Sequence, residues 1–311
     1  YYDDISGAPL QTELVEHAIK EEMDEYKKHG VYRKVPIKEC WNKTGKKPIG
    51  VRWVIVNKGD EVSTDYRARL VAKELKIDER LDLFAATPPL EAKKLLFSRA
   101  ATRRGNRKHL GEYKLSFIDI KRAYFHAPET RDVYVDLPDQ DWEEGMCGKL
   151  DYSMYGTRGA AQNWAFKYEE VLVVEMGFVQ GKGSPCNFYH HERDIRTVVH
   201  GDDFTSLATG DQCDWFAKEL KKHFDLKIRG VLGSGPRDDK SIRILNRIVS
   251  WDEHGITYEC DQRHAEIIIK QLRMSESGVK SVVTPGIKQD AGESQLLDNN
   301  IPSQYRSLTM R

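Results

Sequence analysis

The stretch RTVVHGDDFTSLAT, residues 196–209, places two adjacent aspartates, Asp202 and Asp203, between two runs rich in Val, Thr, Phe and Leu. Both runs have the composition of β-strands, and a glycine precedes the acidic pair, so the pattern predicts a hairpin with the aspartates at its tip. Two carboxylates about 4 Å apart repel each other by roughly 1 kcal/mol even in water. Ordinary turn chemistry can place aspartates there, because Asp bonds its own backbone in turns. The other interpretation is that the pair binds cations.

A third aspartate lies in an equally unusual setting. Asp119 sits in SFIDI (116–120) between apolar residues, where an unpaired buried carboxylate is costly or has a raised pKa. A shared divalent cation removes that cost, and three carboxylates supply the hard oxygen ligands that Mg²⁺ prefers. Two such ions about 3.5–4 Å apart would activate a sugar hydroxyl and stabilise a leaving pyrophosphate. We therefore expect Asp119, Asp202 and Asp203 to lie together.

The composition of the chain excludes several classes of protein. Its 311 residues are 39% hydrophobic, enough for a real core, yet no apolar stretch approaches the ~18–20 residues that span a bilayer. The start lacks the pattern of a signal peptide, so we expect an intracellular protein that is not secreted. The chain begins without Met and stops without a closing element, as a piece of a longer polypeptide would. The five cysteines are widely spaced and form no CxxC, which argues against a disulfide framework and a zinc ribbon.

The charge of the chain is balanced overall but unevenly distributed. Forty-nine basic and 49 acidic residues give no global attraction to nucleic acid. Residues 93–122 contain ten Lys or Arg against two acidic residues, whereas residues 1–30 contain eight acidic residues against three Lys. A basic block is ordinarily a solvated face, and this one gains interest because it leads to Asp119.

The rest of the sequence mixes helical and strand patterns without regular strand–helix–strand units, which indicates an α+β fold. Apolar residues at helical spacing predict helices over residues 11–29, 90–105, 160–178, 211–227 and 262–274. Strand patterns predict hairpins or strands over residues 49–75, 112–125, 133–138, 196–209 and 242–261. Two prolines predict a loop over 84–90, and GVLGSGP (230–236) is predicted as a loop because it lacks the order of a nucleotide-binding fingerprint.

Several motifs together resemble one family in their order and spacing. They are SFIDIKRAYFHA, VYVDLP, SMYGTRGAAQNW, SPCNFYH and VVHGDDF, with VRWVIVNK, YRARLVAKEL and LFAATPPLE upstream and RHAEIIIKQLRM downstream. This set resembles the reverse transcriptases of copia-type (Ty1/copia) LTR retrotransposons, and the resemblance covers roughly residues 12–310. It implies a fragment of a Pol polyprotein folded as a right-hand polymerase, with fingers, palm and thumb and an antiparallel palm sheet that carries the catalytic aspartates.

The resemblance also implies a division of the chain. We expect an N-terminal helix over residues 1–30, fingers and palm over 31–210, a thumb-like region over 211–280, and a linker over 281–311 towards a missing RNase H domain.

The resemblance implies a role for each candidate residue. Asp119, Asp202 and Asp203 would be catalytic and would hold two Mg²⁺ ions, with Mn²⁺ as a substitute. Tyr124 would be the steric gate under the deoxyribose. Arg67, Arg69 and Lys73 would bind the triphosphate, and strand alternation puts these three on one face, which favours a shared role; an exposed basic hairpin face is the other explanation.

The activity implied is that of an RNA-directed DNA polymerase, which transfers a nucleotide from a dNTP to a primer 3′-OH. Its partners would be an RNA template, a DNA or tRNA primer, dNTPs and other Pol domains such as integrase, for DNA integration, and RNase H. It would act without a membrane, in a cytoplasmic particle or the nucleus. Two alternatives stay open: a two-metal nuclease or integrase fold, and a decayed or domesticated copy that only binds nucleic acid.

The sequence departs from the family's pattern at three positions. His200 and Gly201 stand where Tyr and Val usually precede the aspartates, and we expect this glycine to loosen the turn. Gly159 stands where a glutamine would help hold the nucleotide, which predicts lower fidelity or activity.

Overall fold

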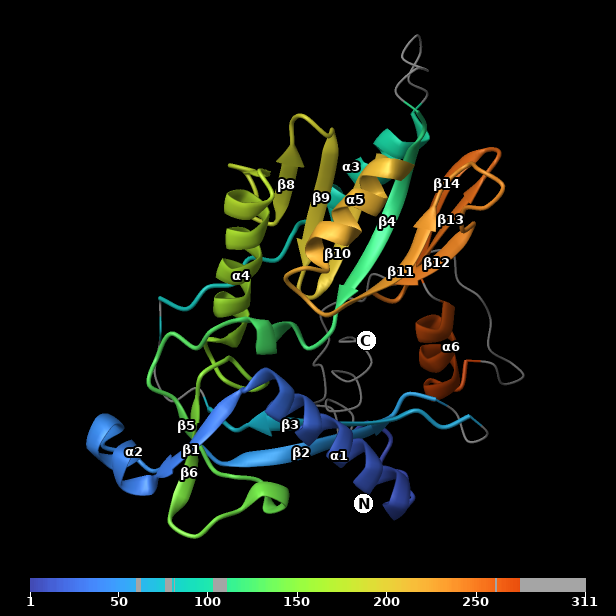
Figure 1. The fold of residues 1–311 in the computed structure, drawn as a ribbon. Coiled ribbons are helices and arrows are strands. Elements are labelled where there is room, and N and C mark those ends of the chain that lie inside the picture. The colour runs from blue at the N-terminus through green and yellow to red at the C-terminus, as the bar shows by residue number, and fades with distance from the viewer. Residues whose placement is uncertain (60–62, 76–79, 81, 103–110, 261, 275–311) are drawn as a thin grey trace, which may run out of the picture. The chain divides into compact units, whose positions relative to one another are not determined.

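The computed structural model describes residues 1–59, 63–75, 80, 82–102, 111–260 and 262–274, in two compact units that span Tyr1–Asp239 and Lys240–Arg311 (Figure 1). The predicted linker over 281–311 and residues 103–110 of the basic block lie outside the described residues. Among the described residues, no helix is both long and apolar enough to span a bilayer.

A six-stranded antiparallel sheet forms the centre of the first unit, in the order β11-β4-β10-β9-β8-β7. Its strands are β4 (Tyr113–Ile120), β7 (Val179–Gln180), β8 (Asn187–His190), β9 (Ile195–His200), β10 (Asp203–Thr209) and β11 (Leu226–Leu232). The strands β9 and β10 are the predicted hairpin, and β4 is the predicted buried strand. The fold is therefore α+β, with an antiparallel sheet that carries all three aspartates at one end, as expected.

Helices cover both faces of this sheet. On one face, α4 (Ala160–Glu170), which continues as a π-helical turn over Val171–Glu175, and α5 (Gly210–Leu220) pack on alternate residues of β4 and β10. The centre of that cluster includes Ile118, Trp164, Phe204 and Phe216. The helix α3 (Leu90–Ala101) contacts β4, β9 and β10, and its buried residues are separate from this cluster. Because side chains alternate along a strand, the neighbours of Ile118 and Phe204 point to the opposite face.

The N-terminal part of the first unit builds a second group of elements. The long helix α1 (Thr12–His29) packs on the hairpin of β2 (Val51–Asn57) and β3 (Tyr66–Ala72), as the buried cluster of Val15, Ile19 and Ile55 shows. A small antiparallel sheet of β1 (Tyr32–Pro36), β6 (Met146–Leu150) and β5 (Tyr134–Val135) lies next to it, with α2 (Ile37–Thr44) following β1. Two 3₁₀ turns, at Ala123–His126 and Asp139–Asp141, complete it.

The second unit has a simple topology of its own. Three antiparallel strands, β12 (Ser241–Ile244), β13 (Arg247–Asp252) and β14 (Gly255–Cys260), form a meander that α6 (Gln262–Gln271) follows.

The sequence located most elements but misplaced some of their ends. The helix over 11–29 ends at Gly30, which has the left-handed conformation of a C-cap, as predicted. The helix predicted over 211–227 was wrong at its end: it stops at Leu220, and residues 226–232, partly predicted as loop, form β11. Residues 242–261, where the pattern predicted one strand–turn–strand pair, hold most or all of three strands, β12, β13 and β14. Strand β11 exists because β4 offers it backbone partners, and a local pattern cannot show a partner from a distant part of the chain.

Gly156 provides a test of how the hairpin is joined to the rest of the first unit. It has φ +83°, and a Cβ there would lie 2.0 Å from the carbonyl oxygen of Ala72 and 2.6 Å from Val71 Cγ1. We expect Gly156→Ala to lower the free energy of unfolding by about 3–5 kcal/mol, because backbone strain and a backbone clash add. Urea denaturation measures this.

The matched control is Gly145→Ala. Gly145 has φ +73°, but a Cβ there would have no described atom within 4 Å. It should lose only about 1–2 kcal/mol, the strain of a left-handed residue. Equal losses in the two variants would show that the contact with Ala72 is unimportant.

Candidate active site

The register of the central sheet brings the three predicted aspartates together. Asp203, the first residue of β10, lies opposite Asp119 on β4 and opposite His200 on β9. Asp202 occupies the turn, and its carbonyl oxygen accepts a hydrogen bond of 2.9 Å from the backbone of Ile120. Asp119 and Asp203 are half-buried and Asp202 is exposed. The turn of the hairpin thus folds against the end of β4, with carboxylates from both.

The turn that holds Asp202 has a hydrogen-bonded anchor at Gly201, the residue that we expected to loosen it. Gly201 has φ +64°, a conformation that glycine adopts at little cost and a β-branched residue resists. The indole Nε1 of Trp164 on α4 donates a hydrogen bond of 2.8 Å to the carbonyl oxygen of Gly201. The glycine therefore suits the turn, and a buried tryptophan anchors it.

The pKa values of two of the carboxylates are raised. Burial, and then the charge of Asp202, raise the pKa of Asp119, while Arg229, Lys227 and Arg67 act in the opposite direction. The pKa of Asp203 is also raised, first by burial and then by Asp202, with Arg229 opposing. Arg229 Nη1 lies 3.6 Å from Asp203 Oδ1. The nearby arginines therefore do not fully offset burial and repulsion, as expected of a site that attracts cations.

A buried lysine that the sequence did not lead us to expect lies near this site. Lys93 on α3 is only 2% exposed, and its Nζ has no hydrogen-bond partner within the described ranges. Burial lowers its pKa to about 8, although Asp203 acts in the opposite direction. Burial, and then Lys93, also lower the pKa of His200. A signal was present, because Lys93 falls in the helical stripe that continues with Leu96 and Ala100.

Two of the three predicted basic residues lie on the exposed face of the hairpin, and one of them, Arg67, is close to Asp119. On β3, Arg67 and Arg69 are exposed and alternate with buried Ala68 and Leu70. Arg67 pairs with Asp65 at 3.1 Å and is close enough to Asp119 to lower its pKa. The two arginines therefore share one face of the hairpin, as alternation predicted.

Tyr124 lies beside the same arginines. Its ring packs edge-on against Tyr155 with centroids 5.3 Å apart, and the guanidinium carbon of Arg69 lies 5.2 Å from the Tyr155 centroid. Burial, and then Asp202, raise the pKa of Tyr124. Tyr155, which the sequence reasoning did not single out, thus links the predicted Tyr124 to the predicted Arg69.

The structure does not bring Lys73 to this group. Its backbone nitrogen donates to the carbonyl oxygen of Gly50, and a Cβ at Gly50 would lie 3.0 Å from Lys73 Cε and 3.7 Å from Asp136 Oδ2. Six residues of extended chain separate it from Arg67, a span of about 20 Å. Lys73 belongs to the opposite end of the hairpin.

Comparisons with known proteins identify the family to which the chain belongs. A family model described as "Reverse transcriptase (RNA-dependent DNA polymerase)" matches residues 38–235. The "Retrovirus-related Pol polyprotein from transposon TNT 1-94" of Nicotiana tabacum is 25% identical over 241 residues, which cover 73% of this chain and 17% of that protein. The "Transposon Ty1-DR1 Gag-Pol polyprotein" of Saccharomyces cerevisiae is 25% identical over 127 residues, 40% of this chain and 7% of that protein. The chain therefore spans only a small part of the length of these relatives.

Two solved structures are similar at lower sequence identity. A foamy viral protease-reverse transcriptase in complex with double-stranded DNA has a TM-score of 0.43 at 12% identity, covering 86% of this chain and 40% of that one. Telomerase from Candida albicans has a TM-score of 0.44 at 10% identity, covering 86% of this chain and 55% of that one.

Lys93 provides the test of the electrostatics of this site. Because its pKa falls from about 10.4 in an unfolded chain to about 8 in the folded one, its charge is unfavourable in the folded state below pH 8. Lys93→Met should therefore raise the free energy of unfolding at pH 7 by about 2–3 kcal/mol.

The sign of the pH dependence checks the cause. Relative to Lys93→Met, the wild type should gain stability as the pH rises from about 8 to 10, because the unfolded chain then binds the proton that the folded chain has lost. Denaturation of both proteins between pH 6 and 10 measures this. Parallel stability profiles would contradict it.

Proposed function

Because the chain belongs to the reverse transcriptase (RNA-dependent DNA polymerase) family, we propose that it is the RNA-directed DNA polymerase of a retrotransposon. It would transfer a nucleotide from a dNTP to the 3′-OH of a primer. The observation that carries this proposal is the register that sets Asp119 opposite Asp203 with Asp202 in the adjoining turn.

The chemistry of the carboxylates suits divalent cations. Three hard oxygen donors come from two strands and a turn and are near enough for Asp202 to raise the pKa values of Asp119 and Asp203, so cations would have to draw their oxygens closer together. Two Mg²⁺ ions, or Mn²⁺ in their place, would lower the pKa of the primer hydroxyl and stabilise the leaving pyrophosphate.

The hairpin and the tyrosine pair would form the nucleotide site. Arg67 and Arg69 would neutralise the triphosphate, since both are exposed on β3, with Arg67 close to Asp119 and Arg69 close to Tyr124. Tyr124, held by Tyr155, would lie under the deoxyribose and exclude a 2′-OH. Lys73 is left out of this role because it lies beside Gly50.

The proposal extends to the division of the chain and to its partners. Helix α5 packs on the central sheet, and β11 pairs with β4 within it. The thumb-like region would therefore begin at Lys240 and not at residue 211. The fingers and palm would lie before it. The template would be RNA and the primer DNA or tRNA, and integrase and RNase H domains would lie elsewhere in the polyprotein of an intracellular particle. The Pol names of the relatives support this.

Primer extension tests the activity. With an RNA template, dNTPs and Mg²⁺ or Mn²⁺, the wild type should extend a DNA primer, and Asp202→Asn should reduce the rate roughly 100-fold or more. The matched control is Asp214→Asn, an exposed aspartate on α5 away from the sheet end, which should keep the wild-type rate.

The outcomes separate the alternatives. RNA binding without extension in the wild type would support a decayed or domesticated copy that only binds nucleic acid. Cleavage of nucleic acid without a need for dNTPs would support a nuclease. Unchanged extension by Asp202→Asn would show that the carboxylates are misassigned.

The proposed gate gives an independent prediction. Tyr124→Ala should raise the use of ribonucleotides relative to deoxyribonucleotides roughly 10- to 100-fold, because the ring no longer excludes the 2′-OH. The ratio of kcat/KM for the two substrates measures it. The control is Tyr155→Phe, which keeps the ring that supports Tyr124, and an unchanged ratio in Tyr124→Ala would remove this tyrosine from the gate.

A further inference from the structure

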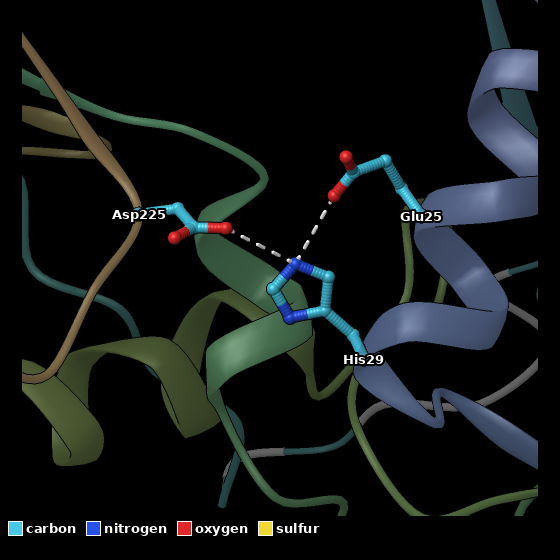
Figure 2. Close-up of side chains that lie close together, drawn as sticks. All are labelled: Glu25, His29 and Asp225. Carbon is cyan, nitrogen blue, oxygen red and sulfur yellow. Dashed lines mark ion pairs between the residues drawn. The ribbon is translucent and has the colours of Figure 1, made fainter.

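A second group of metal-ligating side chains lies outside the three aspartates. Glu25 and His29 are one helical turn apart at the end of α1, and both face Asp225, which precedes β11 (Figure 2). His29 Nε2 lies 3.3 Å from Glu25 Oε2 and 3.6 Å from Asp225 Oδ2.

The spacing of these atoms matches a tetrahedral metal site. Zinc bonds to nitrogen and oxygen measure about 2.0–2.2 Å, which puts neighbouring ligand atoms about 3.3–3.6 Å apart. The two distances from His29 Nε2 fall in that range. This nitrogen is buried and, in the described part of the chain, has no hydrogen-bond partner, although it faces two carboxylates. It thus points at both carboxylates at ion-pair distance.

The donor set selects the kind of cation. One imidazole with two carboxylates suits Zn²⁺, whereas Mg²⁺ prefers oxygen ligands alone. Three protein ligands would leave a fourth position for water.

An ammonium group already shows that the cluster attracts cations. Lys28 Nζ lies 2.7 Å from Asp225 Oδ2 and 3.4 Å from Glu25 Oε2. Its side chain is 56% exposed, so it can move into solvent when another cation arrives. Lys28 would therefore compete with a metal ion for these two carboxylates.

We propose that Glu25, His29 and Asp225 form a Zn²⁺ site that fastens the end of α1 to the start of β11. The carbonyl oxygen of Asp225 accepts a hydrogen bond of 2.8 Å from the backbone of Lys121, two residues after Asp119. A bound ion would thus hold α1 against the segment that follows the first aspartate of the candidate active site. This site is independent of the polymerase activity proposed above.

Zinc titration of the 311-residue chain in millimolar Mg²⁺ tests the proposal. Calorimetry should show one Zn²⁺ bound per chain that Mg²⁺ does not displace. At about 100 times the dissociation constant, Zn²⁺ should raise the melting temperature by roughly 5 °C. His29→Gln and Asp225→Asn should each weaken binding at least roughly tenfold.

The helix carries its own matched control. His17 and Glu21 have the same spacing as His29 and Glu25, with His17 Nδ1 3.7 Å from Glu21 Oε1, but both are exposed and no third ligand joins them among the described residues. His17→Gln should leave Zn²⁺ binding unchanged.

The variant Lys28→Met distinguishes a metal site from a network of ion pairs alone. Its result can be interpreted even if the other variants fail to fold. Removal of the competing ammonium should tighten Zn²⁺ binding roughly tenfold. Co²⁺ should show the visible absorption of a tetrahedral site without a thiolate charge-transfer band. Weaker or equal binding by Lys28→Met, binding that persists in His29→Gln, or a thiolate band from the cysteines would each overturn the proposal.

Discussion

The antiparallel register between β4 and β10 is the constraint on which the rest of the site depends. It sets Asp119 opposite Asp203, and a shift by one residue would turn Asp203 towards the apolar core under α4 and α5. The hydrogen bond of 2.9 Å between the hydroxyls of Thr197 and Ser206 holds β9 in register within the same sheet. Burial of each large side chain such as Phe204 contributes about 1.5–3 kcal/mol, which offsets the repulsion at the sheet end.

The cations around the aspartates come from three separate elements. Arg229 approaches from β11, Arg67 from the hairpin β2–β3, and Lys93 from beneath the sheet on α3. Burial still outweighs them, because the pKa values of Asp119 and Asp203 are raised. The chain therefore tolerates stored repulsion at one place, which is typical of sites that act on charged ligands.

The features that could be predicted from the sequence are those that depend on residues close together along the chain. The hairpin of β9 and β10 is contiguous in sequence, and Asp119 stands out within an apolar strand. By contrast, the sequence pattern of β11 predicts the end of a helix and a loop. The segment is a strand because it pairs with β4. The same limit hid the cluster at His29, whose partner Asp225 lies far along the chain. The sequence shows Lys93 as a charged residue in an apolar helical stripe, but it does not show that Lys93 lies near Asp203.

The departures from the family's pattern fit their surroundings. Gly201 has the positive φ that a valine would resist, and Trp164 secures its carbonyl oxygen. At Gly159, a Cβ would lie 3.4 Å from both Nε and Nη2 of Arg131, which is an ordinary van der Waals contact. Arg131 pairs with Glu74 at 3.0 Å, and Glu74 also accepts a hydrogen bond from the backbone of Arg158, which joins the chain after β3 to the start of α4. Gly201 therefore matches the conformation of its turn, and the ion pair of Arg131 with Glu74 supports the segment next to Gly159.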